Sequence, residues 1–138
     1  MNYLLWAVLA MSAYAMVAPL TKLALDGIPT PVVVLITNAI LIIAAVGVVL
    51  VAREPVGAYL THARAPYMYA AGLFLTIGIM SYYQALSLGP VSIVVPIFGL
   101  FIVVSSVIGV FALDEALTLR KGLGVVLAIG AIILTSLD

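Results

Sequence analysis

The side chains that could carry acid–base, metal or nucleophilic chemistry are few in this sequence, and they are poorly placed for it. The chain has no cysteine, which excludes disulfides, thiol catalysis and iron–sulfur clusters. Its lone histidine, His62, has no second histidine with which to share a metal ion. No Ser–His, Asp–Asp or metal-ligand set falls within its long apolar stretches, so we expect neither an enzyme nor a bound cofactor. A formal net charge of zero gives no electrostatic basis for binding nucleic acid.

The elements that position these residues are apolar and long. The chain is 67% hydrophobic and 7% charged, whereas about a quarter of the residues in soluble domains are charged. Five stretches are each long enough to cross a bilayer as a helix. The sequence therefore predicts an all-α membrane protein whose transmembrane helices span about 3–25, 31–52, 66–87, 90–113 and 119–137. The segment 54–65 between the second and third has apolar residues at helical spacing and is either a membrane-surface helix or an ordinary loop.

An odd number of spans places the two ends of the chain on opposite faces of the membrane. A second copy inserted the other way round would be its inverted repeat, which is the architecture of many transporters. We therefore expect residues 1–138 to form a single transmembrane domain that makes up one half of an inverted-repeat transporter. Of the basic residues, Lys22 lies on one side, and the rest lie on the side of the N-terminus: Arg53, Arg64, Arg120 and Lys121. This bias predicts a cytoplasmic N-terminus and an external C-terminus in the cell membrane.

Lys22 is the one basic residue within an apolar stretch. Tyr14, Ala18 and Thr21 share roughly one helical face with it. Lys22 either faces a substrate pathway and meets an anionic group, or extends its ammonium group to the outer interface.

The second and third spans carry further polar side chains. Thr37 and Asn38 lie two turns into the second span, where an amide must either pack against another helix or line a wet cavity. In the third span, Thr76 and Tyr83 can share one face, and Tyr83 is either a pathway residue or an interfacial tyrosine. Gln84 is a further pathway candidate, because a glutamine is rarely left facing lipid.

Two prolines and one stripe of small residues complete the candidate set. Pro19 and Pro96 are interior to their helices and free the carbonyls of Ala15 and Ser92, so that each is either a gating hinge or a fixed kink. The last span carries small residues at helical spacing, which favour either packing within the chain or contact with another subunit. These residues are Gly124, Ala128, Ala131 and Thr135.

The carboxylates all lie at helix ends or in loops, and they are Asp26, Glu54, Asp114, Glu115 and Asp138. A buried carboxylate with a raised pKa is what a proton-coupled antiporter normally uses. The absence of such a residue from the middle of any span argues against proton-coupled export of organic cations. It favours facilitated passage of neutral or zwitterionic solutes.

Several segments, taken in order, resemble the EamA domain of the drug/metabolite transporter superfamily. They are Thr21 to Leu25, Gln84 to Ser92, Val95-Pro96 and Asp114 to Gly122. The resemblance implies a ten-helix transporter of two inverted five-helix halves, in which Glu115 is a structural cap. Many relatives have a basic residue where this chain has Thr37-Asn38, and some single-domain relatives have charged residues where it has Phe98-Gly99. Both differences weaken an assignment to anionic substrates.

Two functions remain open from the sequence. The first is a transporter subunit that lies in the lipid bilayer and moves small neutral or zwitterionic metabolites, such as amino acids. It would work as a homodimer, either parallel or antiparallel. The second is a non-transporting membrane accessory subunit that packs with another membrane protein.

Overall fold

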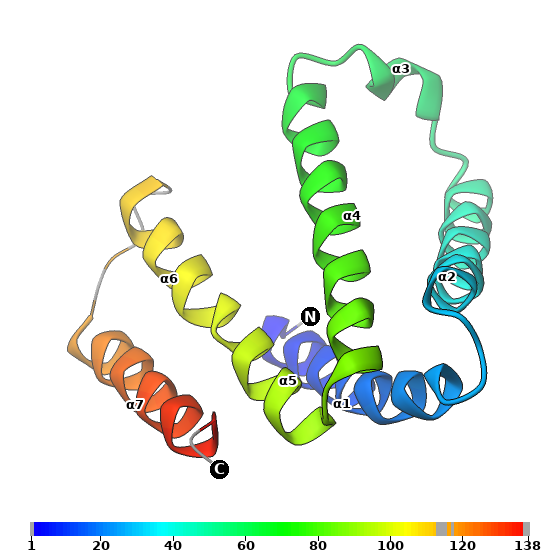
Figure 1. Ribbon diagram of the computed structural model, residues 1–138. Coiled ribbons are helices and arrows are strands. Elements are labelled where there is room, and N and C mark those ends of the chain that lie inside the picture. Colours follow the sequence, from blue (N-terminus) through cyan, green and yellow to red (C-terminus); the bar gives the residue numbers. More distant parts are fainter. Residues whose placement is uncertain (1, 113–115, 117, 137–138) are drawn as a thin grey trace. The chain divides into compact units, whose positions relative to one another are not determined.

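Every element of the computed structural model is helical within the residues that it describes, which are 2–112, 116 and 118–136. This agrees with the predicted all-α membrane class. The elements are α1 (Tyr3–Leu25), α2 (Thr30–Ala52), α3 (Val56–Leu60), α4 (Ala65–Leu88), α5 (Val91–Gly99), α6 (Phe101–Ala112) and α7 (Leu119–Ser136) (Figure 1).

Four segments of the described chain are long and apolar enough to cross a membrane: α1, α2, α4, and α5 together with α6. The predicted fifth span, α7, is the shortest, with 18 residues. At about 1.5 Å of rise per residue it is about 27 Å long, slightly less than the hydrocarbon core of a typical bilayer. Its continuous apolar part runs from Gly122 to Leu134.

The helix ends follow from local chemistry. The Asn2 side chain accepts a hydrogen bond from the Leu4 N–H at 3.2 Å and so caps the start of α1. Pro29 and Pro90 immediately precede α2 and α5, and the ring of each proline fixes φ at the residue before the helix. Arg53 closes α2 in the left-handed conformation, with φ of 54°, and the Glu54 N–H donates back to the Val49 carbonyl at 3.3 Å.

The two interior prolines have different consequences. The first span is one continuous helix through Pro19. The fourth span is interrupted at Leu100, four residues after Pro96, and the Leu100 N–H donates to the Ile97 carbonyl in a tighter turn. The predicted fourth helix is therefore two shorter helices, α5 and α6.

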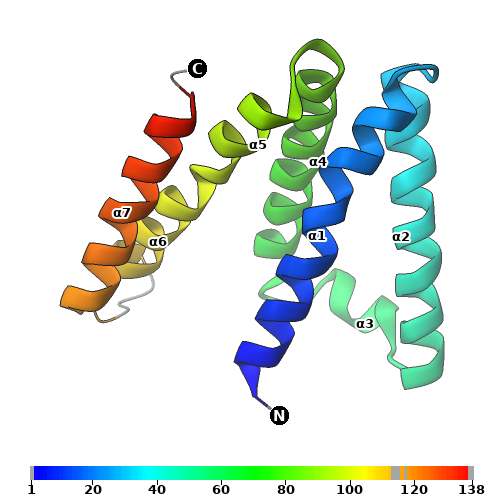
Figure 2. The ribbon, with the colours of Figure 1, turned by 90° about the horizontal axis from the view of Figure 1, so that it is seen from below.

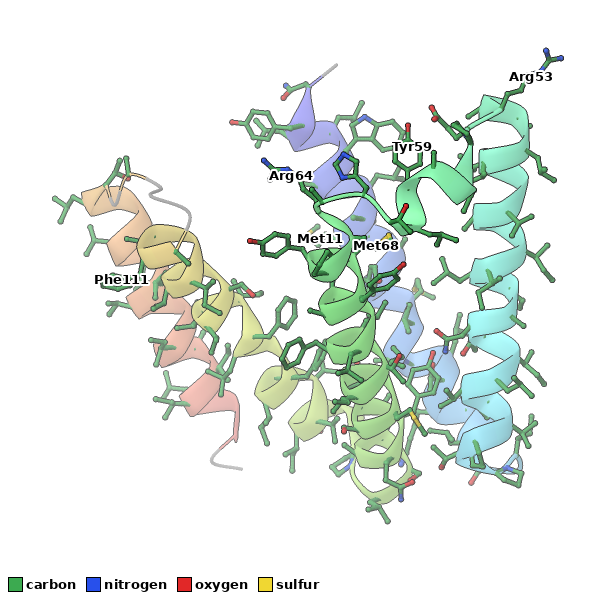
Figure 3. The ribbon with its side chains drawn as sticks, turned by 90° about the horizontal axis from the view of Figure 1, so that it is seen from above. Met11, Arg53, Tyr59, Arg64, Met68 and Phe111 are labelled. Carbon is green, nitrogen blue, oxygen red and sulfur yellow. The ribbon has the colours of Figure 1, made fainter. Side chains whose placement is uncertain are left out.

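The segment between the second and third spans contains a short helix of five residues, followed by turns. This helix is α3, and it ends at Leu60, whose carbonyl accepts a hydrogen bond from the Tyr69 hydroxyl at 2.6 Å. Figure 3 shows Arg53 at the end of α2 and Arg64 at the start of α4, on the side where α3 and the N-terminus lie. The first part of the chain therefore has these two arginines on the same side as the N-terminus, as the sequence predicts.

The chain divides into two compact units, residues 1–88 and 89–138. In the first, α1 and α2 both pack against α4 and touch each other near the α1–α2 turn (Figure 2). The residues buried there are Ala18 and Thr21 of α1, Val33 of α2, and Tyr83 and Leu86 of α4. This small core fixes the end of the first unit opposite the N-terminus.

In the second unit, α7 packs against α5 and α6. A Cβ atom added to Gly99 would lie 3.8 Å from the Ile132 Cδ1 atom, which is an ordinary contact distance. Between α6 and α7 an apolar groove of about 420 Å³ is lined in part by Gly124 and Ala128. Two residues of the predicted small-residue stripe therefore line this groove, although a Cβ atom added to Gly124 would have no neighbour within 4 Å. Ala131 is exposed, and the Thr135 side chain lies outside the described side chains, as do the expected carboxylates at 114, 115 and 138.

Candidate functional site

Lys22 turns its side chain onto α4. Its Nζ atom donates a hydrogen bond to the Leu86 carbonyl at 2.6 Å, and the side chain is half-buried. The neighbouring Thr21 is only 5% exposed and Ala18 only 4% exposed, so this face of α1 is packed inward. The ammonium group of Lys22 therefore links α1 to α4.

The position of Pro90 explains why Leu86 accepts this bond. In a continuing helix the Leu86 carbonyl would be bonded by the N–H of residue 90, but proline has no N–H. Leu86 is fully buried, and a buried carbonyl without a donor is costly. The ammonium group of Lys22 supplies a donor and places a positive charge at the C-terminal end of α4, where the helix dipole favours it.

A second polar contact joins α2 to α4. The Tyr83 hydroxyl donates to Thr37 Oγ1 at 3.2 Å, and Thr37 Oγ1 donates in turn to the Val33 carbonyl at 2.8 Å. Tyr83 is only 4% exposed. Tyr83 is therefore a buried residue of the contact between α2 and α4.

The other predicted pathway residues lie apart from this core. Asn38 is half-buried, and its Nδ2 atom donates to the Val34 carbonyl of its own helix at 2.8 Å. Thr76 is exposed and donates to the Gly72 carbonyl at 2.8 Å. Tyr14 is 70% exposed, and Gln84 is exposed as well. The first unit thus brings Lys22, Thr37 and Tyr83 to one three-helix junction. The other four candidates lie around or outside this junction.

A cavity of about 280 Å³ opens beside Lys22 at this junction, and its lining residues are Lys22, Leu23, Leu25, Asp26 and Ser87. It combines a cation, a carboxylate and the Ser87 hydroxyl, which donates to the Gln84 carbonyl at 2.7 Å. Among the described residues that line the groove between α6 and α7, one has a polar side chain, Ser106, whose hydroxyl donates to the Ile102 carbonyl at 2.8 Å. Sequence reasoning did not select Asp26 and Ser87. The signal for Asp26 was its position four residues after Lys22, which places both on one helical face.

His62 has a local structural contact. Its Nδ1 atom accepts a hydrogen bond from the Arg64 N–H at 3.1 Å. Among the residues that the structure describes, no three His, Cys, Asp or Glu side chains come close enough together to hold a metal ion.

Comparison with known proteins places the chain in one family. The model of the EamA-like transporter family matches residues 1–137, which is nearly the whole sequence. No curated protein and no solved structure matches the chain. The apolar spanning helices and this match together identify an integral membrane protein, and the chain belongs to the EamA-like transporter family.

Proposed function

We propose that this protein moves small neutral or zwitterionic metabolites, such as amino acids, across the cell membrane, and that it works as a dimer. The observation that carries the proposal is the polar junction of α1, α2 and α4. Hydrogen bonds of Lys22, Thr37 and Tyr83 lie there between helices whose outer faces are otherwise strongly apolar. Polar groups at membrane depth are costly, and in transporters they mark substrate pathways.

The positions of the carboxylates support transport without proton coupling. Asp26 follows the end of α1, and Glu54 lies between α2 and α3, so both lie outside the spanning helices. In the sequence the other three carboxylates lie beyond the predicted spans or at their ends. A solute that carries no net charge needs no counter-charge at the membrane centre, and its own concentration gradient can drive its passage.

Dimerisation follows from the architecture that the family resemblance implies. Two copies would together supply ten spans, and the transport pathway would run between them. Pro96 would then be a hinge of the pathway, since it precedes the interruption between α5 and α6. In most copies the N-terminus would lie in the cytoplasm and the C-terminus outside, according to the charge bias.

The direct test is flux. The full chain, reconstituted into liposomes loaded with a mixture of radiolabelled amino acids, should release at least one of them faster than liposomes without protein. The release should be insensitive to an imposed pH gradient. Absence of release for the whole panel would contradict transport, and release only under a pH gradient would contradict the proposed uncoupled passage.

The dimer is tested separately by counting subunits. The chain contains no cysteine, so a single introduced cysteine carries one fluorophore without background labelling. Photobleaching in dilute liposomes should give two steps for most particles. One step for most particles would contradict the dimer, and a stoichiometric second protein in preparations from native membranes would point to an accessory subunit.

A further inference from the structure

The cavity beside Lys22 pairs opposite charges in a small space. Lys22 and Asp26 both line it, and Ser87 contributes a hydroxyl group from the end of α4. Its walls otherwise consist of Leu23 and Leu25. The residues that form it all belong to the first compact unit, close to the buried residues Thr21 and Leu86.

The position of the cation in this cavity is fixed by the fold. The 2.6 Å hydrogen bond to the Leu86 carbonyl holds the Lys22 ammonium group at the cavity wall. The ammonium group keeps its positive charge when it donates to a carbonyl oxygen, so it attracts an anion at the cavity wall. Because the flexible side chain is already ordered, binding an anion there costs less conformational entropy than binding to a free surface lysine.

The carboxylate lies one helical turn further on. Residues four apart on a helix have Cβ atoms about 6 Å apart, so Asp26 and Lys22 can contact the two ends of one small molecule. Asp26 is exposed, so it is accessible to a solute that arrives from the aqueous side. The cavity volume of about 280 Å³ gives room for a small ligand.

We propose that this cavity binds small zwitterions, with the anionic group of the ligand beside Lys22 and its ammonium group beside Asp26. The proposal rests on the proposed transport function and makes the cavity a recognition site at one mouth of the pathway. Leu23 and Leu25 would contact a short apolar side chain of the ligand. Two ligand sources share this chemistry: free amino acids and the headgroup of phosphatidylethanolamine, which joins a phosphate to an ammonium group.

The test compares ligands that differ by one charge. The full chain in phosphatidylglycerol nanodiscs is titrated with L-leucine, its methyl ester, which lacks the carboxylate, and N-acetyl-L-leucine, which lacks the ammonium group. We expect L-leucine to bind about tenfold or more tightly than either analogue, a difference of at least about 1.4 kcal/mol. Equal binding of all three, or no binding of L-leucine together with no binding of phosphatidylethanolamine, would overturn the proposal.

Substitutions assign each charge to its residue. Asp26→Asn should remove the advantage of L-leucine over N-acetyl-L-leucine, and Lys22→Gln should remove its advantage over the methyl ester. Lys22→Arg should retain both preferences, and Glu54→Gln is the matched control because it neutralises an exposed carboxylate in a different loop. Because Lys22 also holds α4, Asp26→Asn gives the decisive result, and an unchanged preference in that variant would contradict the proposal.

Two further measurements distinguish a lipid ligand from a free amino acid, and the binding site from the transport function. If phosphatidylethanolamine, titrated into the nanodiscs, binds with the same dependence on Lys22 and Asp26 while L-leucine does not bind, the ligand is a lipid headgroup. Leucine flux is then measured in liposomes. Binding with the predicted charge preferences but without flux would refute transport and leave the site intact, whereas flux that is unaffected by Asp26→Asn would refute the site and leave transport intact.

Discussion

At the residue scale, a lysine on one helix supplies a hydrogen-bond donor to a carbonyl in the last turn of another. Pro90 has no N–H for the Leu86 carbonyl, and the Lys22 ammonium group donates to that carbonyl at 2.6 Å. The sequence could single out Lys22, because a cation in an apolar stretch is unusual. It could not predict the partner, because a main-chain carbonyl has no sequence signature and the contact requires α1 and α4 to be packed.

The Lys22–Leu86 contact predicts that substitutions of Lys22 and Pro90 have non-additive effects on the free energy of unfolding. Lys22→Met should lower the free energy of unfolding by about 1.5–3 kcal/mol, the usual range for a hydrogen bond to a charged group. Pro90→Ala restores an N–H at the position where a helix would use it, so Lys22→Met should cost less in that background. Thermal or denaturant unfolding in detergent measures the cycle, and equal costs in both backgrounds would contradict the assignment.

The Tyr83–Thr37 contact predicts that losing the acceptor is worse than losing the donor. Tyr83→Phe removes one hydrogen bond, which in membrane proteins contributes about 0.6 kcal/mol on average. Thr37→Val leaves the buried Tyr83 hydroxyl without this acceptor, and an unsatisfied buried group costs about 1–3 kcal/mol. The same unfolding assay should therefore rank Thr37→Val as the more destabilising change. Tyr67→Phe, at a position that is 76% exposed, is the control and should have no effect.

At the element scale, hydropathy and helix-breaking residues predicted most helix boundaries to within one or two residues. Gly27 with Pro29 separates α1 from α2, and Gly89 with Pro90 separates α4 from α5, as expected from their backbone preferences. The interruption at Leu100 was harder to predict. Pro96 indicated a kink, but its position depends on the Leu100 N–H bonding to Ile97 instead of the residue four positions back.

The interruption between α5 and α6 predicts a functional defect without a loss of stability. Pro96→Ala restores an N–H and removes a ring clash, so the helix should become more continuous and unfolding should be no easier. If the interruption is a hinge, flux should fall on the order of tenfold, which corresponds to a shift of about 1.4 kcal/mol in a conformational equilibrium. Pro66→Ala is the control, because Pro66 lies in the first turn of α4, where its missing N–H costs nothing. Unchanged flux in Pro96→Ala would identify a fixed kink.

At the scale of the whole molecule, the distribution of charge connects the fold to membrane insertion. Within the first unit, Arg53 and Arg64 lie at the end that carries the N-terminus (Figure 3), and Lys22 lies near the opposite end of α1. The sequence alone could predict this charge bias. The bias depends only on which loops lie on the same side of the membrane, and the order of the spans determines that. Which helices surround the pathway depends on contacts between side chains and, in the proposed dimer, on a second copy.

The charge bias predicts that most copies insert in one orientation. With a cysteine appended at either end of this cysteine-free chain, a membrane-impermeant reagent should label intact cells at the C-terminus and leave the N-terminus unlabelled. Arg53→Asn combined with Arg64→Gln reduces the bias from four against one to two against one. Asparagine suits the left-handed conformation at residue 53, so the fold should be preserved while the inverted fraction rises. Complete external labelling of the C-terminus in the unmodified chain would exclude an antiparallel homodimer in the cell and require that the dimer be parallel. Equal labelling of both ends would contradict the predicted orientation and supply the inverted copies that an antiparallel dimer needs.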